Sequence, residues 1–215
     1  MSVDSSFAGQ RGSNAPARRI GIFTTNRRLV ITSWDAALAS MTGIAAADAI
    51  GHPLTEVVPD LEARGLLRII EDTAKTGAPT VLAPAFHKYL VPAPTQIPSS
   101  RYDRMQQRAG VAALLEDGRP AGLVVTVEDV TERLELEHQL ATDLRTGDSP
   151  ARLRAIERLK VLSPVEGLGP LPAAMGDEDW QVRRSAVQAL AARRDPALVD
   201  ALVSALREDT GISAC

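Results

Sequence analysis

The sequence predicts an α+β domain followed by a region of helical repeats. Two short β-rich segments, residues 20–23 and 29–32, flank the polar residues 26–28, which suit a hairpin turn. After a series of helical patterns, the period returns to that of strands over residues 81–130. From Ser149 onward only helical periodicity remains, and an offset of 31 residues places Arg152 on Arg183. A chain of 215 residues has room for both parts.

The elements of the first part follow from local signals. Helical patterns over 36–41 and 46–50 end at Gly43 and Gly51, and a longer pattern ends at Gly77 before Pro79. Strands are predicted next, with a hairpin turn over 116–120 and a proline-rich loop over 92–103. Two strands, helices and three further strands predict one antiparallel sheet with helices on one face. The long helix is expected over 61–76, and the later strands over 81–91, 104–115 and 122–130.

Composition narrows the function. Aromatic residues make up only 3% of the chain, so the core must be aliphatic. The 24 Lys and Arg against 27 Asp and Glu leave a net charge of −3, which argues against nucleic-acid binding. No stretch approaches the ~18 apolar residues of a membrane span. The single cysteine, Cys215, excludes a disulfide framework and favours a cytoplasmic location.

Short sequence motifs resemble two known families. The segment 31–37 (Ile-Thr-Ser-Trp-Asp-Ala-Ala), the glycines of 41–43 and 50–54, and the ending 125–133 (Val-Thr-Val-Glu-Asp-Val-Thr-Glu-Arg) resemble PAS domains. The resemblance implies a five-stranded antiparallel sheet with helices on one face, a pocket for a small ligand or cofactor, a sensing role, and an output helix after the last strand. Segment 179–190 (Asp-Trp-Gln-Val-Arg-Arg-Ser-Ala-Val-Gln-Ala-Leu) is similar to HEAT-type repeats, which implies a protein-binding surface.

These patterns divide the chain into four parts. Residues 1–18 are predicted to be a disordered leader, 19–132 a PAS sensor domain, 133–148 a connector helix and 149–215 HEAT-like repeats. The leucines of the charged stretch 131–144 need partners, which predicts a connector or a homodimer contact. Because two repeat units are fewer than the three or so that an array usually needs, the repeats are expected to continue or to dock on a partner protein.

Haem b is the predicted cofactor. On a strand over 81–91, His87 and Tyr89 share one face, and on the next strand the alternating arginines turn Met105 and Gln107 inward. Imidazole and thioether are common axial ligands of haem iron, so His87 and Met105 are the candidate metal ligands, with Gln107 and Tyr89 beside them. The alanine-rich lining leaves room for a porphyrin. Such a site predicts sensing of CO, NO, O2 or redox state.

Two alternatives stand beside haem. Arg101, Arg104, Lys88 and Arg108 could bind an anionic metabolite, or the domain could be a ligand-free dimerisation and docking module. Flavin photochemistry is not expected, because it needs a cysteine near the pocket and Cys215 is the last residue. No glycine-rich phosphate loop, nucleophile elbow or His-Glu-x-x-His motif occurs, so no catalytic residues and no enzyme activity are predicted. The expected protein is a sensor that relays ligand occupancy through residues 131–144 to a repeat-bound partner.

Overall fold

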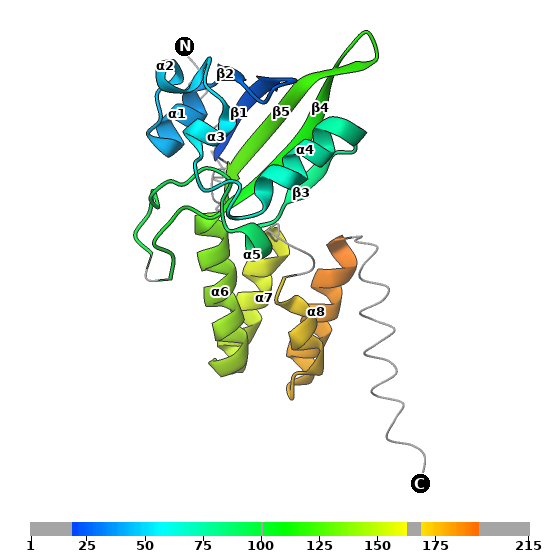
Figure 1. The fold of residues 1–215 in the computed structure, drawn as a ribbon. Coiled ribbons are helices and arrows are strands. Elements are labelled where there is room, and N and C mark those ends of the chain that lie inside the picture. Colours follow the sequence, from blue (N-terminus) through cyan, green and yellow to red (C-terminus); the bar gives the residue numbers. More distant parts are fainter. Residues whose placement is uncertain (1–18, 100, 163–168, 194–215) are drawn as a thin grey trace, which may run out of the picture.

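A computed structural model describes residues 19–99, 101–162 and 169–193. It shows an α+β domain from which a group of helices extends (Figure 1). The predicted leader, residues 1–18, and the second half of the second repeat unit, residues 202–209, lie outside the described residues, as does Cys215.

The sheet has five antiparallel strands, as the sequence predicts, in the order β2-β1-β5-β4-β3. Strand β5 lies at the centre and is hydrogen-bonded on both sides, to β1 from Gly122 to Asp129 and to β4 from Arg119 to Asp129. The strands are β1 (Arg19–Asn26), β2 (Ile31–Trp34), β3 (Thr80–Leu82), β4 (Gln107–Glu116) and β5 (Arg119–Asp129).

Both hairpin turns follow from local chemistry. In the first, the side chain of Asn26 accepts from the amides of Arg28 (2.9 Å) and Val30 (3.1 Å), which closes the turn between β1 and β2. In the second, Asp117 and Gly118 have positive φ values of 52° and 73°. Two successive positive φ values are the requirement of a type I′ turn, whose twist matches that of paired strands.

Four helices follow β2 and cover one face of the sheet (Figure 1). Asp35 caps the first by accepting from the amide of Leu38 at 2.6 Å, and Gly43 ends it at φ 75°. The helix expected over 61–76 begins only at residue 66, because Gly65 at φ 71° interrupts the chain before it. The helices are α1 (Ala36–Thr42), α2 (Ala46–Ala49), α3 (Leu54–Val57) and α4 (Leu66–Thr76).

The predicted strand over 81–91 is wrong beyond its first residues. Strand β3 ends at Leu82, and a short helix, α5 (Pro84–His87), follows. Proline lacks the amide hydrogen that a strand ladder needs, and its fixed φ suits the first position of a helix. Lys88, at φ 60°, then ends α5. The next strand also begins later than expected, at Gln107.

The core of the α+β domain lies between the inner sheet face and the helices. Phe23, Val125 and Val127 from the strands pack with Leu38 and Ile70 from the helices, all fully buried. Among the described residues no helix packs on the outer sheet face, so Ile20, Ile22 and Val81 are exposed there. The domain is therefore a two-layer structure with one uncovered face.

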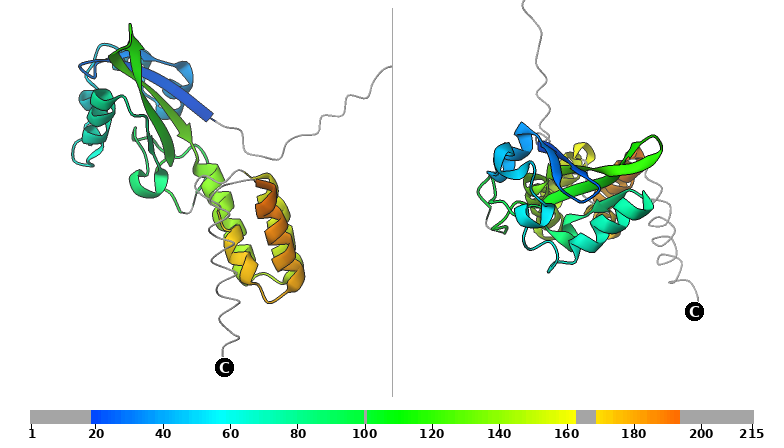
Figure 2. Two further views of the ribbon diagram at one scale, coloured as in Figure 1. Left: turned by 90° about the vertical axis from the view of Figure 1, so that its right-hand side faces the viewer. Right: turned by 45° about the horizontal axis from the view of Figure 1, so that its top comes forward.

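The remaining helices form a second core. Helix α6 leaves the end of β5 and runs beside α7, which in turn packs on α8 (Figure 2). Leu140 and Leu144 of α6 pack into this core, which supports the connector interpretation of the charged stretch. The elements are α6 (Thr131–Thr146), α7 (Ser149–Val161), the 3₁₀ helix η1 (Leu171–Gly176) and α8 (Trp180–Arg193).

The 31-residue offset is reflected in the burial of α7 and α8. Leu159 and Leu190 occupy equivalent positions and are both buried, as are Ala155 and Ala186. Val187 differs, since it is 41% exposed whereas the equivalent Ile156 is fully buried. In the described residues α8 is the last helix. No helix in the described ranges combines the length and the apolar character that a bilayer crossing requires.

Gly122 provides a test of the central strand pairing. A Cβ at this position would lie 1.8 Å from the carbonyl oxygen of Thr25, so Gly122→Ala must push β1 and β5 apart. We expect the free energy of unfolding to fall by about 1–3 kcal/mol. Urea denaturation followed by Trp34 fluorescence in a Trp180→Phe background measures it.

Gly110→Ala is the matched control, because its Cβ would meet only the hydroxyl of Thr126, at 2.8 Å. A side-chain hydroxyl can rotate away, whereas the Thr25 carbonyl cannot. Equal losses from the two substitutions would contradict the proposed close approach.

Candidate functional site

Tyr89 is held by charged side chains from the segment that precedes α4. The guanidinium carbon of Arg64 lies 3.8 Å from the centroid of the Tyr89 ring, and the Tyr89 hydroxyl donates to Asp60 at 3.2 Å. Arg64 also donates to the carbonyl oxygens of His87 (2.7 Å) and Tyr89, and forms an ion pair with Asp60 at 3.5 Å. Arg64 therefore stacks on the ring while its hydrogen bonds fix the chain on both sides of Lys88.

Gln107 fixes the following residues. Its side-chain oxygen accepts from the amides of Leu90 (2.9 Å) and Val91 (3.0 Å), and its side-chain nitrogen donates to the carbonyl of Val91 at 2.6 Å. The side chain is almost fully buried, so these bonds replace the ladder that a strand over 81–91 would have made. Gln107 thus has a structural use for both of its polar atoms.

The four residues predicted to bind haem are only partly brought together. Met105 is fully buried within the core of the α+β domain, whereas His87 is half-buried at the end of α5. Tyr89 lies in the segment 87–91, and Gln107 bonds to the backbone of the same segment. None of the four lines either of the two cavities described below. In the described ranges no three His, Cys, Asp or Glu side chains gather as a metal site would need.

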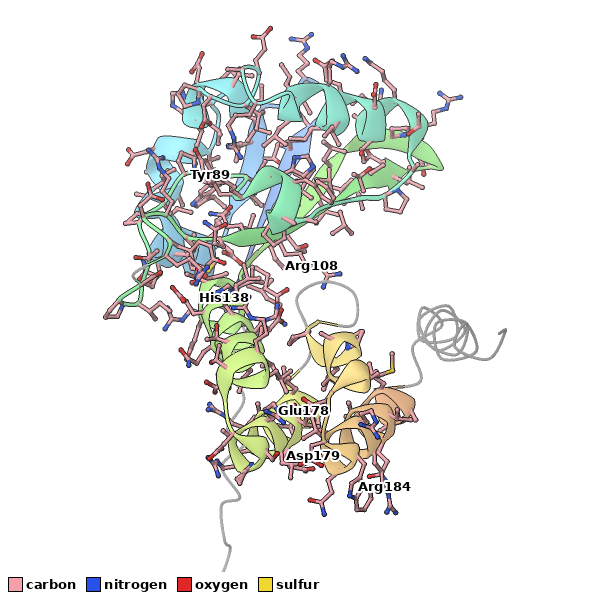
Figure 3. All side chains as sticks on the ribbon, turned by 90° about the horizontal axis from the view of Figure 1, so that it is seen from below. Tyr89, Arg108, His138, Glu178, Asp179 and Arg184 are labelled. Atoms are coloured by element: carbon pink, nitrogen blue, oxygen red, sulfur yellow. The ribbon has the colours of Figure 1, made fainter. Side chains whose placement is uncertain are left out.

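The predicted cluster of cations is divided. Arg108 lines a cavity of ≈ 280 Å³ on the outer sheet face, together with Ile20, Val81 and Glu128. Lys88, Arg101 and Arg104 do not line that cavity. Arg104 instead lies 5.5 Å from the Tyr89 ring, and Figure 3 shows Tyr89 and Arg108 well apart. The alternating pattern correctly predicted that the arginines are exposed, but they do not gather at one site.

The junction between β5 and α6 is held by a set of hydrogen bonds around Thr131. The side chain of Asp129 accepts from the amide (3.0 Å) and the hydroxyl (2.7 Å) of Thr131. The Thr131 hydroxyl oxygen accepts in turn from the amide of Gln106 at 2.9 Å, and the carbonyl of Gln106 accepts from the amide of Val130 at 2.9 Å. The first turn of α6 is thereby joined to the chain that leads into β4.

A buried ion pair reinforces this junction. Arg133 of α6 and Glu128 of β5 lie 3.1 Å apart, with side chains only 8% and 13% exposed. Removing one partner of such a pair leaves a buried charge, which commonly costs about 3–5 kcal/mol. The pair therefore ties the direction of α6 to the end of β5.

The proline-rich loop also contacts α6. The hydroxyl of Ser99 hydrogen-bonds to the carboxylate of Glu135. Tyr102 is half-buried, and burial raises the pKa of its hydroxyl, an effect that Glu135 and Glu137 increase and Arg101 opposes. Loop, sheet end and helix thus meet at one place.

Sequence reasoning quoted residues 125–133 only as a resemblance and assigned no role to Asp129, Thr131 or Arg133. One signal was available: an Asp two residues before a Thr at a helix start is a common local hydrogen-bonding pattern. The pairing of Arg133 with Glu128 and of Thr131 with Gln106 had no such signal, because both depend on tertiary contacts.

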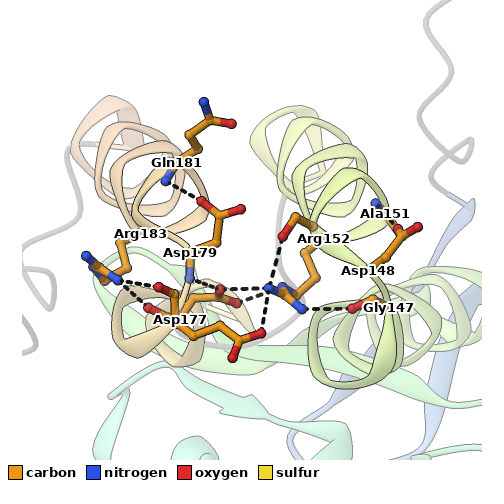
Figure 4. Close-up of polar contacts among 10 residues, drawn as sticks. Gly147, Asp148, Ala151, Arg152, Asp177, Asp179, Gln181 and Arg183 are labelled. Atoms are coloured by element: carbon orange, nitrogen blue, oxygen red, sulfur yellow. Dashed lines mark hydrogen bonds and ion pairs between the residues drawn. The ribbon is translucent and has the colours of Figure 1, made fainter.

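A second polar cluster joins the beginnings of α7 and α8 (Figure 4). Arg152 pairs with Asp177 at 3.0 Å and with Glu178 at 3.3 Å, and it donates to the carbonyl of Gly147 at 2.9 Å. Arg183 donates to the carbonyls of Asp177 (2.7 Å) and Glu178 (3.0 Å). Two arginines therefore bind one acidic turn from both sides.

The fold, the uncovered sheet and the helix that continues the last strand are the features of a sensor-type α+β domain joined to helical repeats. Residues 17–135 match the family model described as PAS fold, and residues 139–212 match the model described as HEAT repeats. The chain belongs to the PAS fold family and carries HEAT repeats after its PAS domain.

Three solved structures are similar to this chain at low identity. The PAS domain of the histidine kinase ThkA is 18% identical, covering 51% of this chain and 98% of its own, with a TM-score of 0.38. A sensory box sensor histidine kinase from Vibrio cholerae is 19% identical, covering 52% and 82%, with a TM-score of 0.39. A PAS domain from Colwellia psychrerythraea is 14% identical, covering 53% and 88%, with a TM-score of 0.40. No curated protein matches the chain.

Asp179 gives the repeat helices a pH dependence. It immediately precedes α8, and hydrogen bonds from Ser149 and from the Gln181 amide (2.8 Å) lower the pKa of its carboxyl. Because the folded pKa lies below the unfolded one, the stabilisation is complete above about pH 4 and is lost as the pH falls through the folded pKa. We expect Asp179→Asn to flatten the acid loss of stability measured by urea unfolding with Trp180 fluorescence in a Trp34→Phe background.

Asp143→Asn is the control, since Asp143 lies within α6 and bonds only to the side chain of Gln139. It should leave the acid dependence of α8 unchanged. An unaltered acid profile for Asp179→Asn would refute the role assigned to Asp179.

Proposed function

We propose that this chain is a non-enzymatic signalling protein in which the state of the PAS domain is passed through α6 to the HEAT repeats, which bind a protein partner. The observation that supports it is the bonded junction of Asp129, Thr131 and Gln106. Helix α6 begins two residues after β5 ends, so no linker separates sensor and output.

Gln106 and Gln107 connect segment 87–91 to the start of α6. Gln107 holds Leu90 and Val91, and its neighbour Gln106 holds Thr131 and Val130. A ligand that displaces segment 87–91 would therefore act on the residue next to the one that anchors α6. A ligand that binds one arrangement better than the other shifts the population of the junction by its difference in affinity.

The C-terminal part of α6 connects the PAS domain to the repeats. Leu140 and Leu144 are packed in the core that α7 and α8 share, so α6 cannot tilt without moving that core. Helix α6 is therefore fixed at both ends, to the sheet at its first turn and to the repeats at its last turns. Partner binding by the repeats would respond to such a movement.

The input signal is a separate question, and haem b is the input that the sequence predicts. The residues present fit a haem poorly in this structure, because Gln107 is bonded to backbone, Met105 is packed in the core and His87 ends α5. A porphyrin would need segment 87–91 to move. Gas sensing and the cytoplasmic location both stay predictions, as does a homodimer.

Thr131→Val tests the relay. The substitution keeps the shape of the side chain but removes the hydroxyl that bonds Asp129 and Gln106. We expect amide hydrogen exchange in the first turns of α6 to accelerate about tenfold, because the substitution removes at least one buried hydrogen bond. Exchange in α7 and α8 should rise as well.

Thr142→Val on the same helix is the control, because its hydroxyl donates to the carbonyl of His138 and accepts from the side chain of Arg145, and both partners lie within α6. Faster exchange confined to residues 131–134, with α7 and α8 unchanged, would show that the junction is structural and would end the relay proposal.

Haem binding has a direct test. On titration with haemin, the intact chain should develop a Soret band if His87 is an axial ligand. His87→Ala should then lose most of that absorbance, while Met105→Leu should retain it at a shifted wavelength. A wild-type chain that develops no Soret band, or a His87→Ala variant that keeps the full band, would refute the predicted ligand.

A further inference from the structure

A cavity with a basic wall lies at the other end of β5, away from the α6 junction. Its volume is ≈ 450 Å³, within the ~300–1,000 Å³ of small-molecule sites. The turn between β1 and β2, the last turns of α4 and the beginning of β5 each provide part of its wall. The lining residues are Arg27, Arg28, Leu29, Glu71, Ala74, Lys75, Pro120 and Gly122.

The charge of this lining is opposite to that of the whole chain. Arg27, Arg28 and Lys75 face a single acidic residue, Glu71, whereas the chain as a whole carries a net charge of −3. Glu71 forms an ion pair with Lys75 at 3.5 Å, so it offsets the lysine and leaves the two arginines in excess. An anion entering the cavity therefore meets a local excess of positive charge.

The cationic wall is held in place by backbone contacts. Arg27 donates from Nε to the carbonyl of Pro120 at 2.5 Å, which ties its side chain to the beginning of β5 in the cavity wall. The backbone of Arg28 is held by Asn26, whose side chain accepts from its amide. Both arginines thus project from a turn that is already ordered, which lowers the entropy cost of ligand binding.

Apart from Glu71, the rest of the cavity lining is apolar side chains and backbone. Leu29 and Ala74 are half-buried and pack against the domain core. Gly122 lies so close to the Thr25 carbonyl that only glycine fits there, so the backbone itself forms that part of the wall. The cavity therefore offers cations on one side and an apolar surface on the other.

We propose that this cavity is a binding site for a small organic anion with an apolar body, such as an aryl phosphate or aryl carboxylate. The guanidinium groups of Arg27 and Arg28 would bind the anionic group, with Lys75 as an additional charge. Leu29, Ala74 and Pro120 would contact the apolar body. The site shares no lining residue with the four residues predicted to bind haem, and it does not depend on the relay.

The position of the cavity gives the site a path to the output. Pro120 and Gly122 begin the strand that ends at Asp129, and β5 is hydrogen-bonded to its neighbours along this length. Anion binding at this cavity does not require that α6 relay a signal, so the site would bind even if the relay did not operate.

The test is a titration of the ¹⁵N-labelled full chain with three probes: phenyl phosphate, inorganic phosphate and benzyl alcohol. We expect phenyl phosphate to produce saturable amide shifts over residues 26–30, 71–76 and 119–123, and to bind at least about tenfold more tightly than either of the other two. Arg28→Gln and Lys75→Gln should each weaken phenyl phosphate by several-fold, and the double variant should weaken it about tenfold or more.

Arg68→Gln is the matched control. It removes one positive charge from the same helix as Lys75, at an exposed position outside the cavity lining, and should leave the affinity unchanged. The proposal is overturned by shifts that fail to saturate or spread over the surface, by equal binding of inorganic phosphate, or by an Arg68→Gln effect as large as that of Arg28→Gln.

Discussion

The continuity of β5 with α6 is the constraint on which the rest of this structure depends. Strand β5 is hydrogen-bonded on both sides, so its end cannot move independently of the sheet. The chain then enters α6 within two residues, and a buried ion pair fixes the helix direction by joining Glu128 to Arg133. Sheet and repeats are therefore parts of one bonded path rather than two bodies on a flexible tether.

The same strand separates two functionally different ends of the PAS domain. At its end lies the junction with α6, where Gln106, Thr131 and Asp129 share hydrogen bonds. At its beginning lies the basic cavity, whose wall includes Pro120 and Gly122. The segment around Tyr89 is held by contacts with Arg64 and Gln107.

Charged side chains hold the described repeat helices together. Arg152 fixes the start of α7 to the acidic turn before α8, and that turn is bound again by Arg183. Arg183 is the residue that the 31-residue offset places on Arg152. Trp180, Arg184 and Val187 are exposed on α8, and their spacing of three and four residues places them on one face of the helix. Among the described residues, this face is of the kind that a stacking unit or a partner covers.

Local signals determined much of the fold. Gly43, Gly77 and the Asp117–Gly118 turn end or reverse the chain through backbone conformations that depend on neighbouring residues alone, and the repeat offset follows from side-chain periodicity. For this reason the order of strands and helices along the chain, the helical cover, the hairpins and the two families could be inferred from the sequence.

What only the tertiary structure decided is the use of the polar side chains. An alternating pattern over 81–91 suggested a strand with His87 facing inward, but Pro84 starts a helix there and Gln107 supplies the missing backbone bonds from another strand. Likewise, Arg27, Lys75 and Gly122 meet at one cavity although they come from a turn, a helix and a strand far apart in the chain. Hydrogen bonds and charge clusters between distant segments depend on where the elements pack, and periodicity carries no information about that.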